Sequence, residues 1–141
     1  MPNLNFRIMK SEYSFLMIVF LAIIGCNSSM AHDKNWIAPE YSNSLVNPFK
    51  ENENATNEGK AIFTQMCVIC QGATGQGNDE AGLSLKSKPI NFLALKVLNE
   101  TDGTIFWKLN EGKAPMASYK ELLREDQLWK LVNYIRKLEL K

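Results

Sequence analysis

The sequence is short of the residues that usually hold metals or disulfides. Its 141 residues include three cysteines and a single histidine, His32. Three cysteines and one histidine are too few for a disulfide framework. A zinc site built on two of the thiols would lack a second pair of ligands. Neither basic nor acidic residues predominate, because 16 basic and 15 acidic residues give a net charge of +1. The composition, 45% apolar and 22% charged, is that of one globular domain with no sign of a nucleic-acid partner.

Long hydrophobic runs are also lacking. The main apolar run, residues 15–24, follows Arg7 and Lys10 and is too short to span a bilayer comfortably. A basic start followed by such a run indicates a secretory signal peptide. The run leads into Gly25 and Cys26, which resembles the cleavage site of bacterial lipoproteins. We therefore expect residues 1–25 to be removed and the Cys26 thiol to carry lipid, which would anchor the chain in the cell envelope, facing the periplasm. The alternative is an uncleaved helix with an incidental cysteine.

The rest of the chain divides into a polar stretch and a folded domain. Residues 26–55 are rich in asparagine and have few periodic apolar positions. This pattern predicts a tether, although several apolar residues in its second half are suited to packing on the domain. We expect the domain to span residues 56–141, with Thr56 as the N-cap of its first helix.

Three helices are predicted in this domain. In the first, spacings of four, four and three residues place four residues on one face: Gly59, Phe63, Cys67 and Cys70. The second is expected to start at Asp102, as N-cap, and to end at Gly112. The last covers about residues 125–138, where apolar side chains recur with helical period: Leu128, Leu131, Val132, Ile135 and Leu138. No strand pattern is found, which predicts an all-α domain.

The central motif of the domain is Cys67-Val68-Ile69-Cys70-Gln71. With histidine in the last position it would read C-x-x-C-H, the attachment site of c-type haem. In such a site the thiols bind the porphyrin, the histidine binds the iron, and a second ligand usually comes from the opposite side. Met116, which follows a proline on a loop, is the candidate for that second ligand, since a thioether is a soft donor suited to ferrous iron. Taken alone, Met116 would be an ordinary core residue.

Residues 56–141 resemble a class I, mono-haem cytochrome c domain of the small bacterial type. The similarity covers the whole domain and rests on short motifs around the cysteines and Met116: Gly59-Lys60, Gly72-Ala73-Thr74-Gly75, Lys88-Pro89-Ile90-Asn91-Phe92, Ile105-Phe106-Trp107, Pro115-Met116 and Trp129-Lys130-Leu131-Val132-Asn133-Tyr134. The resemblance implies a cytochrome c-like fold of several short helices around a haem pocket. The first and last helices would cross, with two contacts from each: Gly59 and Phe63 against Leu131 and Tyr134.

The resemblance also implies a function. Haem c would be attached to Cys67 and Cys70, Met116 would bind its iron, and the domain would carry single electrons between redox proteins of a membrane-associated respiratory chain. Gln71 departs from the family pattern, because the family has histidine there as iron ligand and as part of the motif that the attachment machinery recognises. A glutamine oxygen is a hard, weak ligand for haem iron. We therefore expect altered iron ligation, with Gln71 or another oxygen donor beside the iron.

Several alternatives remain open at this point. The main one is a haemless cytochrome-like domain that acts as a binding or structural module, although the sequence shows no enlarged core to replace the haem. A thiol–disulfide enzyme is disfavoured because its C-x-x-C pair usually sits at a helix N-terminus, where the thiol pKa is lowered. The chain is thus expected not to be an enzyme, with weak peroxidase-like activity only if the iron has an open position. Four aromatic residues are candidates for a haem pocket or for ordinary core: Phe92, Phe106, Trp107 and Tyr119.

Overall fold

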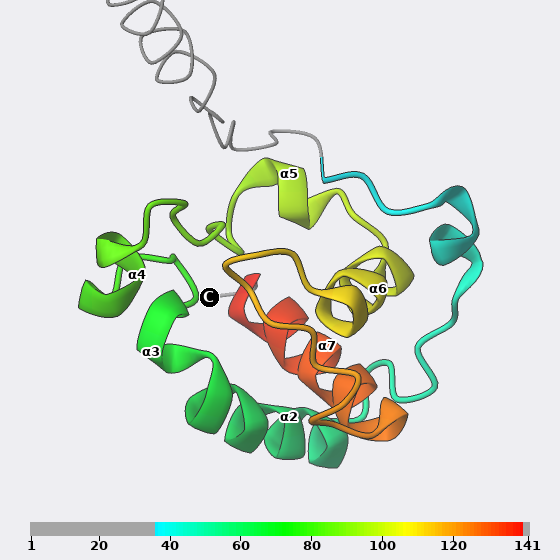
Figure 1. Ribbon diagram of the computed structural model, residues 1–141. Helices are drawn as coiled ribbons and strands as arrows, with labels where there is room; N and C mark the ends of the chain where they lie inside the picture. The colour runs from blue at the N-terminus through cyan, green and yellow to red at the C-terminus, as the bar shows by residue number, and fades with distance from the viewer. Residues whose placement is uncertain (1–35, 140–141) are drawn as a thin grey trace, which may run out of the picture. The chain divides into compact units, whose positions relative to one another are not determined.

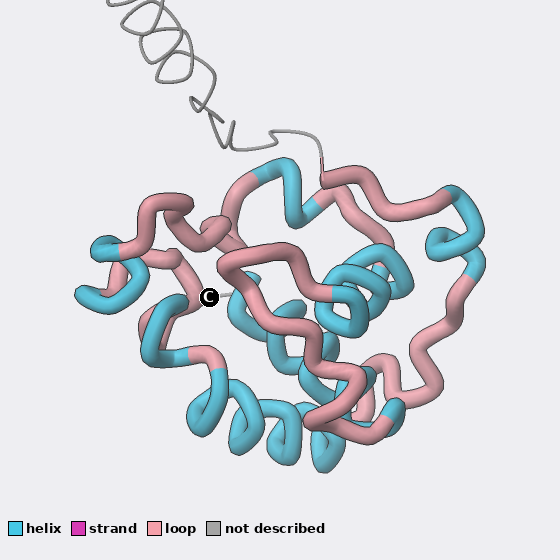
Figure 2. The backbone as a smooth tube through the Cα atoms, in the orientation of Figure 1, coloured by secondary structure: helices cyan, strands magenta, loops and turns pink. Residues whose placement is uncertain are grey.

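The computed structural model describes residues 36–139, and the regular structure in that part of the chain is helical. A 3-10 helix is followed by six α-helices: η1 (Glu40–Ser44), α2 (Glu53–Met66), α3 (Val68–Gln71), α4 (Glu80–Ser84), α5 (Leu95–Leu98), α6 (Asp102–Glu111) and α7 (Glu125–Glu139). Figure 2 shows that long loops join several of them, and no strand occurs between residues 36 and 139. The all-α prediction is confirmed. None of the helices in this range combines the length and the apolar character needed to cross a bilayer.

Helices α2 and α7 form the main helix–helix contact of the domain (Figure 1). Gly59 allows this contact, because a Cβ atom at this position would lie only 1.9 Å from the carbonyl oxygen of Lys130. One turn further along α2, the ring of Phe63 packs against the ring of Tyr134 with 5.1 Å between centroids. The predicted contact between the first and last helices is therefore confirmed, and at Gly59 it brings backbone against backbone.

The apolar stripe of α7 is the centre of the core. Its five members are each at most 4% exposed: Leu128, Leu131, Val132, Ile135 and Leu138. Phe63 of α2 is fully buried against them, and Ile105 and Leu109 of α6 belong to the same cluster. Burial of one such side chain contributes about 1.5–3 kcal/mol. The predicted periodicity of the last helix is confirmed.

The first helix of the domain begins earlier than predicted. Asn52, not Thr56, is the N-cap of α2, since its side-chain oxygen accepts a hydrogen bond from the Ala55 backbone N–H at 2.9 Å. The Thr56 hydroxyl instead donates to the Asn52 carbonyl oxygen at 2.8 Å, inside the first turn. The prediction for Thr56 is wrong because asparagine and threonine both cap helices well, and the spacing of the apolar residues does not choose between them.

The start of α6 also differs by one residue. The hydroxyl of Thr101 accepts a hydrogen bond from the Thr104 N–H at 3.1 Å, so Thr101 is the N-cap and Asp102 is the first helical residue. The Asp102 carboxylate accepts a hydrogen bond from Arg136 Nε of α7 at 2.8 Å instead. The prediction of Asp102 as N-cap is wrong because a long-range partner holds its side chain.

Residues 36–52 pack on α6 and α7. Helix η1 lies against α6, where a Cβ atom at Gly103 would lie 2.0 Å from the Ser42 carbonyl oxygen. The buried amide of Asn47 donates to Asn133 Oδ1 at 2.7 Å, and Asn133 in turn donates to the Phe49 carbonyl. The described end of the predicted tether is therefore held by buried hydrogen bonds to α7.

Residues 1–35 and 140–141 lie outside the described part of the chain. The signal peptide over residues 1–25 and the lipid on Cys26 therefore stay predictions.

We expect Gly59→Leu to destabilise the domain by about 1–3 kcal/mol, because a side chain there must push the backbone of α7 away from α2. Chemical denaturation would measure the change in the free energy of unfolding. Ala61→Leu, at an exposed position of the same helix, is the matched control and should shift stability by no more than about 0.5 kcal/mol. Equal effects of the two substitutions would contradict the close contact at Gly59.

Candidate functional site

The two thiols of the central motif lie on one tight turn between α2 and α3. The Cys67 carbonyl oxygen accepts hydrogen bonds from the N–H groups of Cys70 at 3.1 Å and Gln71 at 2.8 Å. The Cys67 N–H donates to the Phe63 carbonyl oxygen at 2.8 Å, which ties the turn to α2. One continuous helix was predicted from Gly59 to Cys70, but the helix breaks at Cys67, between α2 and α3. The two cysteines are nevertheless one turn apart.

Glycines allow other backbone segments to close on this turn. A Cβ atom at Gly82 in α4 would lie 2.2 Å from the Cys70 carbonyl oxygen, so α4 packs directly on α3 (Figure 1). Gly72 ends α3 with a φ of +71°, and the N–H of Gly77 donates to the Gln71 carbonyl oxygen at 2.9 Å. The backbone of Cys70 and Gln71 is thus fixed from two sides, as a site for a rigid ligand requires.

The two cysteines are free thiols in different environments. Cys67 is buried and Cys70 is half-buried. Burial raises the pKa of Cys67 to about 11; the hydrogen bond with the Tyr119 side chain lowers this pKa, and nearby Cys70 raises it. Burial, followed by the charge of ionised Cys67, raises the pKa of Tyr119 to about 12. At neutral pH Cys67 is therefore a protonated thiol, which differs from the low-pKa thiolate of a thiol–disulfide enzyme.

Met116 lies on a loop that folds back onto α6. Gly112 ends α6 with a φ of +64°, and the Tyr119 N–H then donates to the Leu109 carbonyl oxygen at 3.1 Å. Between them, Lys113 and Met116 exchange two backbone hydrogen bonds of 3.0 and 2.8 Å. The side chains of Met116 and Tyr119 are half-buried against the core cluster that contains Cys67. The structure therefore brings the methionine loop and the cysteine turn to the same core.

Gln71 carries an unusual buried atom. The residue is 9% exposed, and its Oε1 is the buried side-chain oxygen that has no hydrogen-bond partner in residues 36–139. Leaving a buried acceptor unpaired costs about 1–3 kcal/mol. A water molecule, another donor or a cation beside it would satisfy such an atom.

Some of the apolar side chains that pack on the core cluster stay half-buried. They include Val68, Leu93, Phe106, Met116, Tyr119 and Leu123. Of the four predicted aromatics, Phe106 and Tyr119 belong to this set, and Phe92 is core, with its ring 6.3 Å from that of Phe63. Trp107 instead packs against Trp36 with ring centroids 6.3 Å apart. The Tyr119–Cys67 hydrogen bond was missed, because nothing in the sequence spacing links a loop tyrosine to one particular thiol.

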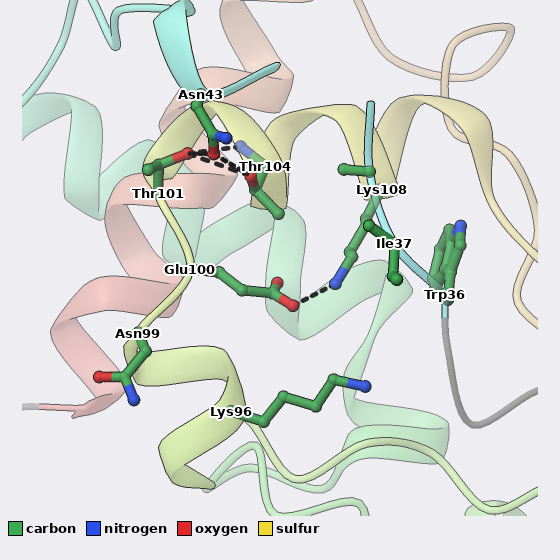
Figure 3. A pocket seen from close by; sticks show the side chains of 10 residues that line it. Trp36, Ile37, Asn43, Lys96, Asn99, Glu100, Thr101, Thr104 and Lys108 are labelled. Atoms are coloured by element: carbon green, nitrogen blue, oxygen red, sulfur yellow. Dashed lines mark hydrogen bonds and ion pairs between the residues drawn. The ribbon is translucent and has the colours of Figure 1, made fainter. Parts of the chain in front are cut away.

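A pocket that the sequence did not predict lies elsewhere in the domain (Figure 3). It has a volume of about 250 Å³ and lies between α5, the start of α6 and the segment around Trp36. The ammonium of Lys108 pairs with Glu100 there and lies 5.7 Å from the centroid of the Trp36 ring. None of the predicted haem-site residues lines it. Across the described residues, no three His, Cys, Asp or Glu side chains gather as in a metal centre.

The crossing of α2 and α7 brings the C-x-x-C turn and the methionine loop to one core, which is the arrangement that a cytochrome c domain requires. The chain belongs to the family described as "Cytochrome C oxidase, cbb3-type, subunit III", which it matches over residues 54–135. The match runs from α2 into α7 and so contains the whole candidate site. No curated protein matches the chain significantly.

The family implies a haem, and three features of the site bear on whether the residues suit one. Two thiols on a fixed turn suit covalent attachment, and the half-buried apolar side chains suit a large apolar ring. The buried Oε1 of Gln71 lies where the motif ends and has no hydrogen-bond partner among residues 36–139, so an oxygen donor is available there. The residues therefore fit a haem, with a weak oxygen donor where the motif normally has an imidazole.

In protein without haem, we expect the free energy of unfolding to fall as pH rises from about 9 to about 11. Unfolded Cys67 ionises near its ordinary pKa of 9.0 and the folded form near 11, so the folded chain binds more protons in this window and loses stability through it. Cys67 contributes about 2–3 kcal/mol to this loss, and the raised pKa of Tyr119 adds to it from about pH 10 upward. Denaturation curves across this pH range would measure it. Cys67→Ala should show a shallower fall, and equal falls would contradict the raised pKa.

Proposed function

We propose that this domain carries covalently attached haem c and transfers single electrons in a membrane-associated respiratory chain. The observation that carries the proposal is the fixed turn that holds Cys67 and Cys70, in a chain that belongs to a cytochrome c family. When bound, haem c supplies an iron that accepts one electron from a donor and passes it to an acceptor. This role is consistent with family membership, and it makes the chain an electron carrier rather than an enzyme.

The chain's own residues hold and shield the group. Cys67 and Cys70 would fix the porphyrin through two thioether bonds, and Met116 would offer its sulfur to the iron. Burial raises the pKa of Cys67, so in the folded chain this thiol is not a spontaneously reactive thiolate at neutral pH. The half-buried apolar side chains would exclude water from the ring, and exclusion of water is one of the factors that set a haem potential.

The partners and the location follow from the family and from the N-terminal sequence. The family description names a subunit of an oxidase, and we infer that the electron donor and acceptor are respiratory-chain proteins. Lipid on Cys26 would hold the domain at the membrane, facing the periplasm. The near-neutral charge of the chain gives no preferred sign of charge on its partners.

A haemless domain is the second candidate function, and Gln71 is the observation that favours it. Without the imidazole, the motif lacks the residue that attachment machinery recognises in this family. Such a domain would act as a binding or structural module, with its two thiols free.

We expect protein produced with a cytochrome c maturation system to contain covalent haem, and Gln71→His to contain more of it. The imidazole restores both the attachment motif and a strong iron ligand, so the variant should also be low-spin and have a higher reduction potential. Haem staining on denaturing gels measures attachment, and absorption spectra during redox titration measure the rest. If only Gln71→His carries haem, the haemless alternative replaces the proposal for this chain.

Two further variants separate attachment from ligation. The double variant Cys67→Ala/Cys70→Ala should lose covalent haem. Met116→Ala should keep it but lose any far-red absorption band that reports a sulfur–iron bond. An unchanged spectrum in Met116→Ala would remove Met116 from the site.

We expect the mature protein to partition with membranes, and Cys26→Ala to release it or to stall its processing, because the acylated thiol would be the anchor. Membrane fractionation measures the distribution, and mass spectrometry of the mature N-terminus identifies the lipid. An unmodified Cys26 on a mature, membrane-bound chain would contradict the lipid anchor.

A further inference from the structure

The two thiols of the cysteine turn differ in how far a reagent from solvent can reach them. Cys67 is 7% exposed and belongs to the core cluster, whereas Cys70 is half-buried and its neighbour Ile69 is 66% exposed. Both cysteines are free thiols. A reagent that approaches the folded domain therefore meets the Cys70 sulfur first.

The side chain of Tyr119 adds to the shielding of Cys67. It packs on the core cluster and forms a hydrogen bond with Cys67. The backbone of Tyr119 is held as well, because its N–H donates to the Leu109 carbonyl oxygen at 3.1 Å and its carbonyl oxygen accepts from the Leu123 N–H at 2.8 Å. Burial raises the pKa of Cys67 to about 11, and the protonated thiol that results at neutral pH is not a nucleophile.

The backbone of the turn keeps the two sulfur atoms in these separate environments. The Cys67 N–H donates to the Phe63 carbonyl oxygen at 2.8 Å, and the Cys67 carbonyl oxygen accepts from the Cys70 N–H at 3.1 Å. On the other side of the turn, α4 packs on the Cys70 carbonyl oxygen at Gly82. Cys67 therefore stays in the core while the domain is folded.

We propose that Cys70 is a site of reversible modification by small-molecule disulfides in the haem-free chain, and that the mixed disulfide persists because Cys67 is shielded. The Cys70 thiolate attacks one sulfur of the reagent and a new S–S bond forms. The other half of the reagent leaves as a thiolate and takes up the proton that Cys70 has lost. An external thiol reverses the step.

Closure of the turn is the reaction that the fold prevents. A Cys67–Cys70 disulfide would release the second half of the reagent, but it requires a Cys67 thiolate at the Cys70 sulfur. The inference goes beyond the proposed function, because it concerns the chain before haem is attached and holds equally for a haemless module.

The test uses the full chain produced without haem and carrying Cys26→Ala, which leaves only the two thiols of the turn. Near-ultraviolet circular dichroism checks its tertiary structure. Oxidised glutathione is added at neutral pH, and the products are trapped with acid and mapped by mass spectrometry of peptides. We expect one glutathione on Cys70 and a free thiol at Cys67. In denaturant Cys67 is exposed, so the Cys67–Cys70 disulfide should become the main product.

Two substitutions of Tyr119 define its part in the shielding. Tyr119→Ala removes the side chain that contacts Cys67, and it should speed closure of the mixed disulfide by about tenfold, because an exposed thiol ionises more easily. Tyr119→Phe keeps the ring and should keep the glutathione on Cys70, as in the parent chain.

Two single-thiol variants test the difference between the cysteines without changing Tyr119. Cys67→Ser should take up glutathione as fast as the parent chain does. Cys70→Ser, which keeps only the buried thiol, should take it up about tenfold more slowly or less.

Three results would overturn the inference. The first is a Cys67–Cys70 disulfide as the main product of the folded parent chain, and the second is equal uptake by the two single-thiol variants. The third is a haem-free chain without tertiary structure that reacts as it does in denaturant. None of these results measures covalent haem, which haem staining reports, so the inference and the proposed function can fail separately.

Discussion

The contact between the backbones of α2 and α7 is the constraint on which the rest of the domain depends. Gly59 lets the two helices meet without an intervening side chain, and Phe63 then reaches Tyr134 and the buried stripe of α7. Because the cysteine turn follows directly on α2 and is tied to Phe63 by a hydrogen bond, the position of the thiols is set by this same contact. A shift of α2 along α7 would therefore move the thiols relative to the methionine loop, which is tied to α6.

The backbone of the site is held by hydrogen bonds, whereas some of its side chains lack hydrogen-bond partners or are only half-buried. The turn at Cys67 is fixed by hydrogen bonds and by the close approach of α4 at Gly82. Against this frame, Gln71 holds an unpaired oxygen and several apolar side chains remain half-buried. The unpaired oxygen is a cost to folding, and the half-buried side chains leave part of their apolar surface in contact with solvent.

The sequence predicted the helices with strong apolar periodicity and the contact between the first and last of them, because burial of one face decides both. It placed the caps at Thr56 and Asp102 incorrectly, since several residues of similar capping ability stand next to one another and long-range partners choose among them. The motif and the proline–methionine loop identified the two cysteines and Met116 as candidate site residues. The burial of Cys67 and its hydrogen bond to Tyr119 could not be predicted, because they depend on loop packing. The unpaired state of Gln71 likewise has no counterpart in residue spacing.

The hydrogen bonds between Asn47 and α7 have a consequence for where the folded domain begins. Buried amides join the segment before α2 to the last helix, so a chain cut immediately before α2 would leave the Asn133 side chain without these partners. An unpaired buried acceptor costs about 1–3 kcal/mol. The segment before α2 is therefore part of the stable domain, although its sequence lacks the apolar periodicity that marks the helices.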